Sequence, residues 1–81
     1  MVICFYTTSG CHLCELAAVL LDDPDVRHRV QVDTYDIADA DTLIEKYGER
    51  IPVLLRADTQ NELGWPFDLV MLKEFIMGAE E

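Results

Sequence analysis

The order of apolar runs and turn residues predicts an α/β protein whose four-stranded mixed sheet carries helices on both faces. Three observations support this fold class: a continuous apolar run at the N-terminus, two helical stripes separated by an alternating run, and two short apolar runs before a last stripe. Strands that alternate with amphipathic helices are typical of α/β units. The predicted order is β-α-β-α-β-β-α. No Pro-, Gly- or Ser-rich linker interrupts the 81 residues, so we expect one domain spanning residues 1–81.

The first half of the chain predicts two strands joined by a helix. The run Val2–Tyr6 is apolar and β-branched and ends in a polar loop, as in a strand buried on both faces. A helix then begins near Cys11 and ends at Asp22-Asp23-Pro24. Its apolar stripe consists of Leu13, Leu16, Ala17, Leu20 and Leu21. Valines alternating with polar residues predict the second strand, from Arg29 to Tyr35.

The next elements are a helix and a third strand. Asp39 is the expected helix N-cap, a stripe that ends at Tyr47 marks the buried face, and Gly48 is expected to end the helix in the left-handed conformation. A strand follows Pro52 and covers Val53–Leu55. The right-handed crossover rule leads us to expect that the first three strands are parallel.

The last part of the chain predicts a hairpin and a helix. A polar turn, Ala57–Asn61, leads into a short fourth strand, Glu62–Gly64, which forms an antiparallel edge of the sheet. Asp68 is the expected cap of the last helix, whose core side would carry Leu69, Leu72, Phe75 and Ile76.

Charge and cysteine usage restrict the partners and the compartment. The chain has 6 Lys and Arg against 16 Asp and Glu, a formal charge of −10, which repels phosphate backbones and anionic membranes. We therefore expect no nucleic acid and no membrane partner. The acidic surface keeps a small domain soluble and also suits a basic protein partner. Three cysteines, an odd number, and an apolar N-terminus without a basic leader favour a cytoplasmic protein over a secreted, disulfide-stapled scaffold. Nothing in the sequence suggests an obligate oligomer, so we expect a monomer.

Two cysteines lie at the junction between the first predicted strand and the first predicted helix. Cys11-His12-Leu13-Cys14 falls on the first helical turn, where backbone N–H groups have no partner within the helix. These donors and the helix dipole stabilise an anion, and the thiolate is the attacking species in disulfide exchange. Cys11 is therefore the predicted nucleophile. Cys14, one turn later on the same face, is the predicted resolving thiol.

Two segments resemble the thioredoxin superfamily, and most closely its small glutaredoxin-like branch. They are Tyr6-Thr-Thr-Ser-Gly-Cys-His-Leu-Cys14 and Tyr47-Gly-Glu-Arg-Ile-Pro-Val53. The resemblance covers nearly the whole chain and implies a thioredoxin-like fold with a cis peptide bond between Ile51 and Pro52. It also implies that the backbone of Ile51 pairs with an extended substrate, beside a proline that donates no hydrogen bond.

The sequence departs from the glutaredoxin pattern where glutathione would bind. Glutaredoxins usually carry a lysine before the cysteine pair and a Gly-Gly-Asp-like turn after the fourth strand. This chain has Thr7-Thr8-Ser9-Gly10 and Gly64-Trp65-Pro66-Phe67-Asp68 instead. Arg50 is the basic residue that would supply a local positive site, and its alternative role is that of a solvated loop residue. We expect no bound cofactor, with glutathione as a candidate reductant or co-substrate.

The remaining candidates have both a functional and a packing interpretation. An imidazolium at His12 would favour the Cys11 thiolate, or the ring would face solvent with little effect. Tyr6 would flank a substrate groove or pack in the core. Cys4 is expected to be a buried, inert core residue. No second ligand pair accompanies Cys11 and Cys14, so we expect no metal site.

These residues predict a thiol–disulfide oxidoreductase that acts in cell redox homeostasis on a protein disulfide or a glutathione mixed disulfide. The alternative is a non-catalytic binding or redox-sensing module with an acidic partner surface, because fold alone does not fix function. An iron–sulfur cluster shared by two chains through glutathione is a third alternative, against which the weak glutathione signal counts.

Overall fold

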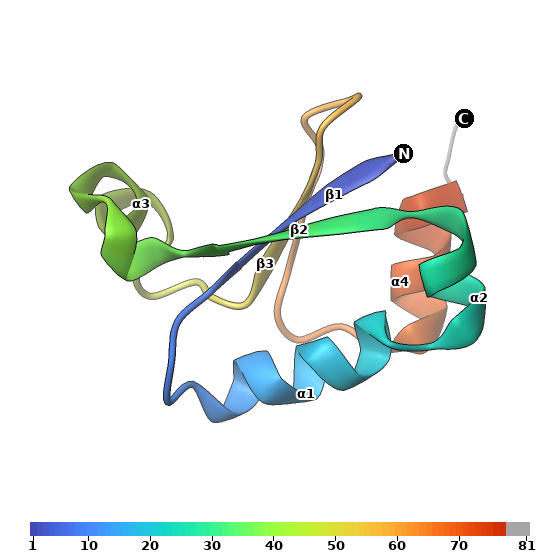
Figure 1. The fold of residues 1–81 in the computed structure, drawn as a ribbon, viewed down its shortest axis with the longest axis horizontal. Coiled ribbons are helices and arrows are strands. Elements are labelled where there is room, and N and C mark those ends of the chain that lie inside the picture. Colours follow the sequence, from blue (N-terminus) through green and yellow to red (C-terminus); the bar gives the residue numbers. More distant parts are fainter. Residues whose placement is uncertain (78–81) are drawn as a thin grey trace.

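The computed structural model describes residues 1–77 and contains one four-stranded mixed sheet in the order β2-β1-β3-β4 (Figure 1). The strands are β1 (Val2–Thr7), β2 (Gln31–Asp36), β3 (Val53–Arg56) and β4 (Glu62–Gly64). The helices are α1 (His12–Leu21), α2 (Pro24–Arg29), α3 (Asp41–Tyr47) and α4 (Leu69–Met77), with a 3₁₀ turn, η1 (Ile37–Asp39), before α3. The predicted α/β fold class is confirmed.

The direction of the third strand differs from the expectation. β2 is parallel to β1, but β3 is antiparallel to β1, so the expectation of three parallel strands is wrong. The crossover rule applies only to parallel strands and does not decide this direction. The seven residues of α3, at about 1.5 Å per residue, span roughly half the length of a six-residue strand. The chain therefore turns at the end of β2 and enters β3 from that same end (Figure 1).

Helices pack on both faces of the sheet, but unequally. Ile3 and Phe5 of β1 and Leu54 of β3 form one buried cluster with residues of α1, α2 and α4. On the opposite face, Val53 forms a smaller cluster with η1 and α3, and Tyr6 packs against it. Alternation along each strand produces this division, because successive side chains point to opposite faces.

The buried row of α1 differs from the predicted stripe. The helix buries Cys14, Ala17 and Leu21, whereas Leu13 and Leu16 are 43% and 42% exposed. The apolar residues of the helix occupy more than one face, so the apolar pattern alone does not identify the face that packs. The side of the helix that faces the sheet is the one that carries Cys14, Ala17 and Leu21.

The helix α2 was not expected, because Asp22-Asp23-Pro24 was interpreted only as a helix stop. Asp23 caps α2 by accepting a hydrogen bond from the backbone N–H of Asp25 at 3.0 Å, and Pro24 occupies the first turn. An acidic N-cap followed by proline is a helix start signal as well. The buried side chain of Val26 fixes α2 against the core.

Both ends of α3 differ from the expectation. Asp39 lies within η1, which is capped by Asp36 through the N–H of Ala38 at 2.9 Å, so the N-cap of α3 is Ala40 and makes no side-chain hydrogen bond. Gly48 has a φ of −50°, which is helical and not left-handed. Its lack of a side chain is still required, because a Cβ there would lie 2.5 Å from the carbonyl oxygen of Ile44.

Cys4 is also placed differently from the expectation. It is a free thiol of intermediate exposure, on the same face of β1 as Tyr6. Because α3 packs near one end of that face, it leaves Cys4 partly exposed, and the expectation of a buried core cysteine is wrong.

Within residues 1–77, no helix is long and apolar enough to span a membrane.

The packing predicts different costs for two truncations in α4. Leu72 is fully buried, and we expect Leu72→Ala to lower the free energy of unfolding by about 2–5 kcal/mol. Val70 is 66% exposed, and Val70→Ala should change it by less than about 0.5 kcal/mol. Urea unfolding followed by circular dichroism measures both. Similar losses for the two variants would contradict the placement of α4.

Candidate active site

A short loop brings the chain from β1 to the start of α1. Gly10 has a φ of +78°, in the left-handed region that glycine adopts without strain. Cys11 follows in an extended conformation as the N-cap of α1. The glycine therefore reverses the chain so that the first helical turn starts at the cysteine pair.

Cys11 and Cys14 form a disulfide, with their Cα atoms 5.2 Å apart. Cys14 is 3% exposed and belongs to the main core cluster, whereas Cys11 is half-buried at its edge. The two sulfurs thus differ in access. Cys11 is the more accessible of the two sulfurs, and the roles of nucleophile and resolving thiol stay a prediction.

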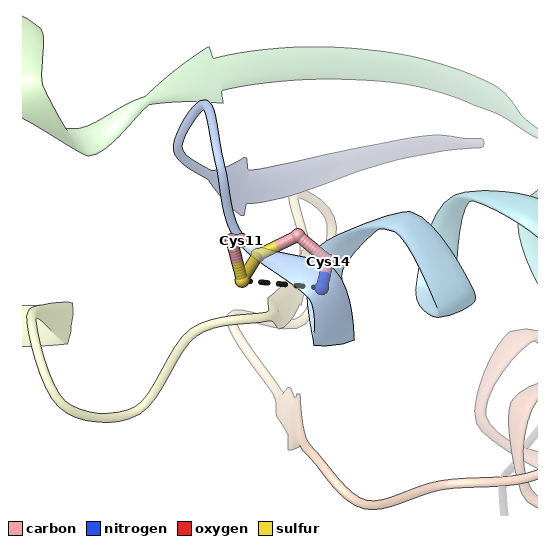
Figure 2. The surroundings of a disulfide bond; sticks show 2 residues. All are labelled: Cys11 and Cys14. Carbon is pink, nitrogen blue, oxygen red and sulfur yellow. Dashed lines mark hydrogen bonds between the residues drawn. A yellow bond between two sulfur atoms is a disulfide. The ribbon is translucent and has the colours of Figure 1, made fainter.

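The backbone of α1 donates a hydrogen bond to the sulfur of Cys11. The N–H of Cys14 lies 3.2 Å from the Sγ of Cys11 (Figure 2). This N–H is one of the donors that lack a partner within the first helical turn. A hydrogen bond to a charged acceptor is stronger than one to a neutral acceptor, so this donor would stabilise a thiolate at Cys11 if it kept its place after reduction.

Ile51 and Pro52 lie beside the cysteine loop. Val53 pairs with Tyr6 near the end of β1, so the two preceding residues adjoin the loop that leads to Cys11. Figures 1 and 2 both show the segment between α3 and β3 passing beside that loop. The Ile51–Pro52 peptide bond is cis, and so is the Trp65–Pro66 bond, for which the sequence analysis made no prediction.

The backbone of Ile51 is already partly occupied. Its N–H donates to the carbonyl oxygen of Tyr47 at 3.1 Å, and the carbonyl oxygen of Pro52 accepts the N–H of Trp65 at 3.2 Å. The N–H of Ile51 is therefore already used within the chain.

Tyr6 packs on the other side of the sheet from Cys14. Its ring stacks on Tyr47 at 4.4 Å and on Tyr35 at 5.6 Å between ring centroids. Burial, with a smaller effect of neighbouring Cys4, raises the pKa of Tyr6 to about 12. The structure thus gives Tyr6 a packing contact with α3 and does not direct its ring toward the buried cysteine.

Arg50 is held by an acidic residue that the sequence analysis did not single out. Its guanidinium donates to one oxygen of Glu62, and the Tyr47 hydroxyl donates to the other at 2.9 Å. The hydrogen bond from Arg50, followed by that from Tyr47, lowers the pKa of Glu62. Burial first, and then the bond to Glu62, raises the pKa of Tyr47 to about 12. The predicted positive site is therefore largely neutralised.

No sequence motif predicts the cluster of Tyr47, Arg50 and Glu62, because Glu62 lies on a three-residue strand far from α3 in the chain. Lys46, also unremarked in the sequence analysis, lies 5.3 Å from the centre of the Tyr47 ring, as does Arg50.

His12 is exposed to solvent on the first turn of α1. Among residues 1–77, no three His, Cys, Asp or Glu side chains lie together as metal ligands would.

The Glu62 cluster predicts a pH-dependent contribution to stability. Because the pKa of Glu62 is lowered in the folded chain, its contribution is present above the ordinary value of 4.5 and is lost as the pH falls through the lowered value. We expect Glu62→Gln to cost about 1 kcal/mol at neutral pH. That difference should vanish in acid. Urea unfolding of both proteins across this range measures it, and a pH-independent difference would contradict the assignment.

Comparison with known proteins agrees with this geometry. Residues 2–77, which include the cysteine pair and Pro52, match the model of the family described as Glutaredoxin-like domain (DUF836). The chain is also similar to the X-ray structure of the Northeast Structural Genomics target protein XcR50 from X. campestris, with 31% sequence identity and a TM-score of 0.82. That similarity covers 96% of this chain and 99% of the other. No curated protein matches the chain. The chain belongs to the glutaredoxin-like domain family.

Proposed function

We propose that this protein is a thiol–disulfide oxidoreductase with Cys11 as the nucleophile and Cys14 as the resolving thiol. The observation that carries the proposal is the hydrogen bond from the N–H of Cys14 to the sulfur of Cys11 at the start of α1. The family match supports a redox-related role for a chain with this fold. The difference in burial between the two sulfurs supports the assignment of roles.

The reaction proceeds in two exchanges. The Cys11 thiolate attacks one sulfur of the substrate disulfide, a new S–S bond forms, and the other substrate sulfur leaves as a thiolate that takes up a proton. Cys14 then loses its proton and attacks the Sγ of Cys11, which releases the second substrate thiol. Two electrons pass to the substrate, and the protein is left with the Cys11–Cys14 disulfide. The burial of Cys14 delays its reaction until the mixed disulfide has formed next to it.

A thiol donor must reduce the Cys11–Cys14 disulfide to close the cycle. Glutathione or a reductase-linked thiol protein is the donor class, and the substrate is a protein disulfide or a glutathione mixed disulfide. The proposal places a monomeric protein in the cytoplasm, where the thiol pool is reducing. Because Glu62 neutralises Arg50, the charge at this site contributes little to binding anionic glutathione.

A redox titration in glutathione buffers, quenched by alkylation and measured by intact mass, tests the function. We expect the Cys11–Cys14 disulfide to form near the cytosolic potential and Cys14→Ser to accumulate a glutathione adduct on Cys11. Cys11→Ser should abolish turnover, and the matched control Cys4→Ser should retain it.

Two other outcomes would count against the enzyme. A disulfide that forms without turnover of any disulfide substrate would favour the redox-sensing module. If neither disulfide nor adduct appears across the range, the binding module becomes the better account.

The ion pair between Arg50 and Glu62 predicts a substitution that raises the affinity for glutathione. Glu62→Gln releases the Arg50 guanidinium from its carboxylate, so we expect KM for a glutathione mixed disulfide to fall several-fold, with little change for an uncharged disulfide. Arg50→Gln in the native background should change KM less than twofold by the same reasoning, a rough limit. Adding Arg50→Gln to Glu62→Gln should reverse the gain. A large loss from Arg50→Gln alone would instead assign Arg50 a direct role in binding.

A further inference from the structure

The strand β2 forms one edge of the sheet, because its neighbour in the strand order lies on one side only. It is six residues long, twice the length of β4 at the other edge. Native edge strands are commonly protected by proline, charged side chains (lysine above all), a bulge or a covering segment. The sequence of β2, Gln-Val-Asp-Thr-Tyr-Asp, contains neither proline nor lysine, and its charged residues are Asp33 and Asp36. Its register with β1 runs without interruption from Gln31 to Asp36.

One hydrogen bond identifies which backbone N–H and C=O groups of β2 face β1 and which face the open edge. The N–H of Gln31 donates to the carbonyl oxygen of Met1 at 2.9 Å and therefore points toward β1. Successive residues of a strand direct their N–H and C=O groups to alternate sides. The backbone groups of Val32 and Thr34 consequently point to the open edge, where an extended chain would find both donors and acceptors.

The side chains of those two residues line a cavity. Val32 and Thr34 form its sheet side, and Phe5, Leu21 and Val30 contribute apolar walls. Its volume is about 410 Å³. At its margin Asp22 and Arg27 form an exposed pair at 4.0 Å. A strand added to β2 would place every second side chain on this face, so apolar residues suit those positions.

The other face of the same edge is acidic and aromatic. Asp33 and Tyr35 share that face by alternation, and Tyr35 is 43% exposed. The ion pairs formed within residues 1–77 do not involve Asp33, whose carboxylate accepts a hydrogen bond from the side chain of Gln31 at 3.1 Å. A carboxylate next to an exposed aromatic ring favours a cationic side chain. The intervening positions of an added strand therefore suit lysine or arginine.

We propose that β2 binds an extended segment of a partner protein in which apolar and basic residues alternate. The charge argues against a second copy of this chain, because each copy carries a formal charge of −10 and each β2 edge carries Asp33. Asp36 pairs with Thr7, which precedes the loop to Cys11, so one end of the bound segment lies toward the disulfide. The binding itself requires no redox step.

Amide hydrogen exchange with a synthetic peptide tests the proposal. The probe is a short, capped peptide in which valine and lysine alternate, added to the ¹⁵N-labelled full chain with the Cys11–Cys14 disulfide intact. We expect the amides of Val32 and Thr34 to exchange rapidly in the free protein and at least about tenfold more slowly with saturating peptide. The amide of Gln31, already bonded to Met1, should change little.

Two matched pairs separate strand addition from attraction between charges. Thr34→Pro removes an outward N–H that the sheet does not use and should weaken peptide binding about tenfold, whereas Thr34→Val keeps the N–H and should bind normally. A peptide N-methylated at the residues that face β2 should bind about tenfold more weakly than one methylated at the alternate residues. The peptide pair gives the test even if Thr34→Pro does not fold.

Several results would overturn the proposal. They are absence of peptide binding at millimolar concentration, equal binding of a glutamate–valine peptide, equal binding of the two methylated peptides, and binding that leaves Val32 and Thr34 unprotected. Protection of these amides in the free protein that grows with its concentration would identify a second copy as the occupant.

Discussion

The position of the cysteine pair depends on the packing of one side of α1 against the sheet. Cys14, Ala17 and Leu21 are buried over the face that carries Ile3 and Phe5, and this contact fixes both the axis and the rotation of the helix. The first-turn N–H groups then point toward the loop from β1. The sulfur of Cys11 meets one of them because Cys14 cannot turn outward without opening the core. A packing contact therefore determines the electrostatic environment of the candidate nucleophile.

The surroundings of the pair differ from what its motif implies. The sequence offers Arg50 either as a local positive site or as a solvated loop residue, and the structure places it in a cluster with Glu62 and Tyr47. That cluster connects the end of α3 and the residue next to Ile51 to β4. Arg50 thus joins the segment beside the disulfide to β4, and its charge is paired with a carboxylate. In an acidic domain carboxylates outnumber cationic side chains, so a cation such as Arg50 readily forms an ion pair with one of them.

The sequence predicts the local elements well and the long-range relations poorly. β4, α4 with its cap at Asp68, and the strand-to-helix position of Cys11 and Cys14 follow from turn residues and periodicity, which are local signals. The direction of β3 depends on the length of α3 relative to the strands, and the Arg50–Glu62 pair depends on β4 lying next to β3. Neither is encoded within a short window. The helix α2 was missed for another reason: Asp23-Pro24 both ends one helix and begins the next.

The contact between Cys14 N–H and Cys11 Sγ links the fold to the electron affinity of the cysteine pair. A thiolate accepts this hydrogen bond more strongly than a disulfide sulfur does, so α1 is better capped in the reduced protein. By thermodynamic linkage, any free energy that reduction adds to the folded state makes the disulfide a stronger oxidant. A substitution along the helix that never touches a sulfur alters the reduction potential only where it stabilises the first turn differently in the two redox states. Helix capping and reduction potential are thus thermodynamically coupled at this one hydrogen bond.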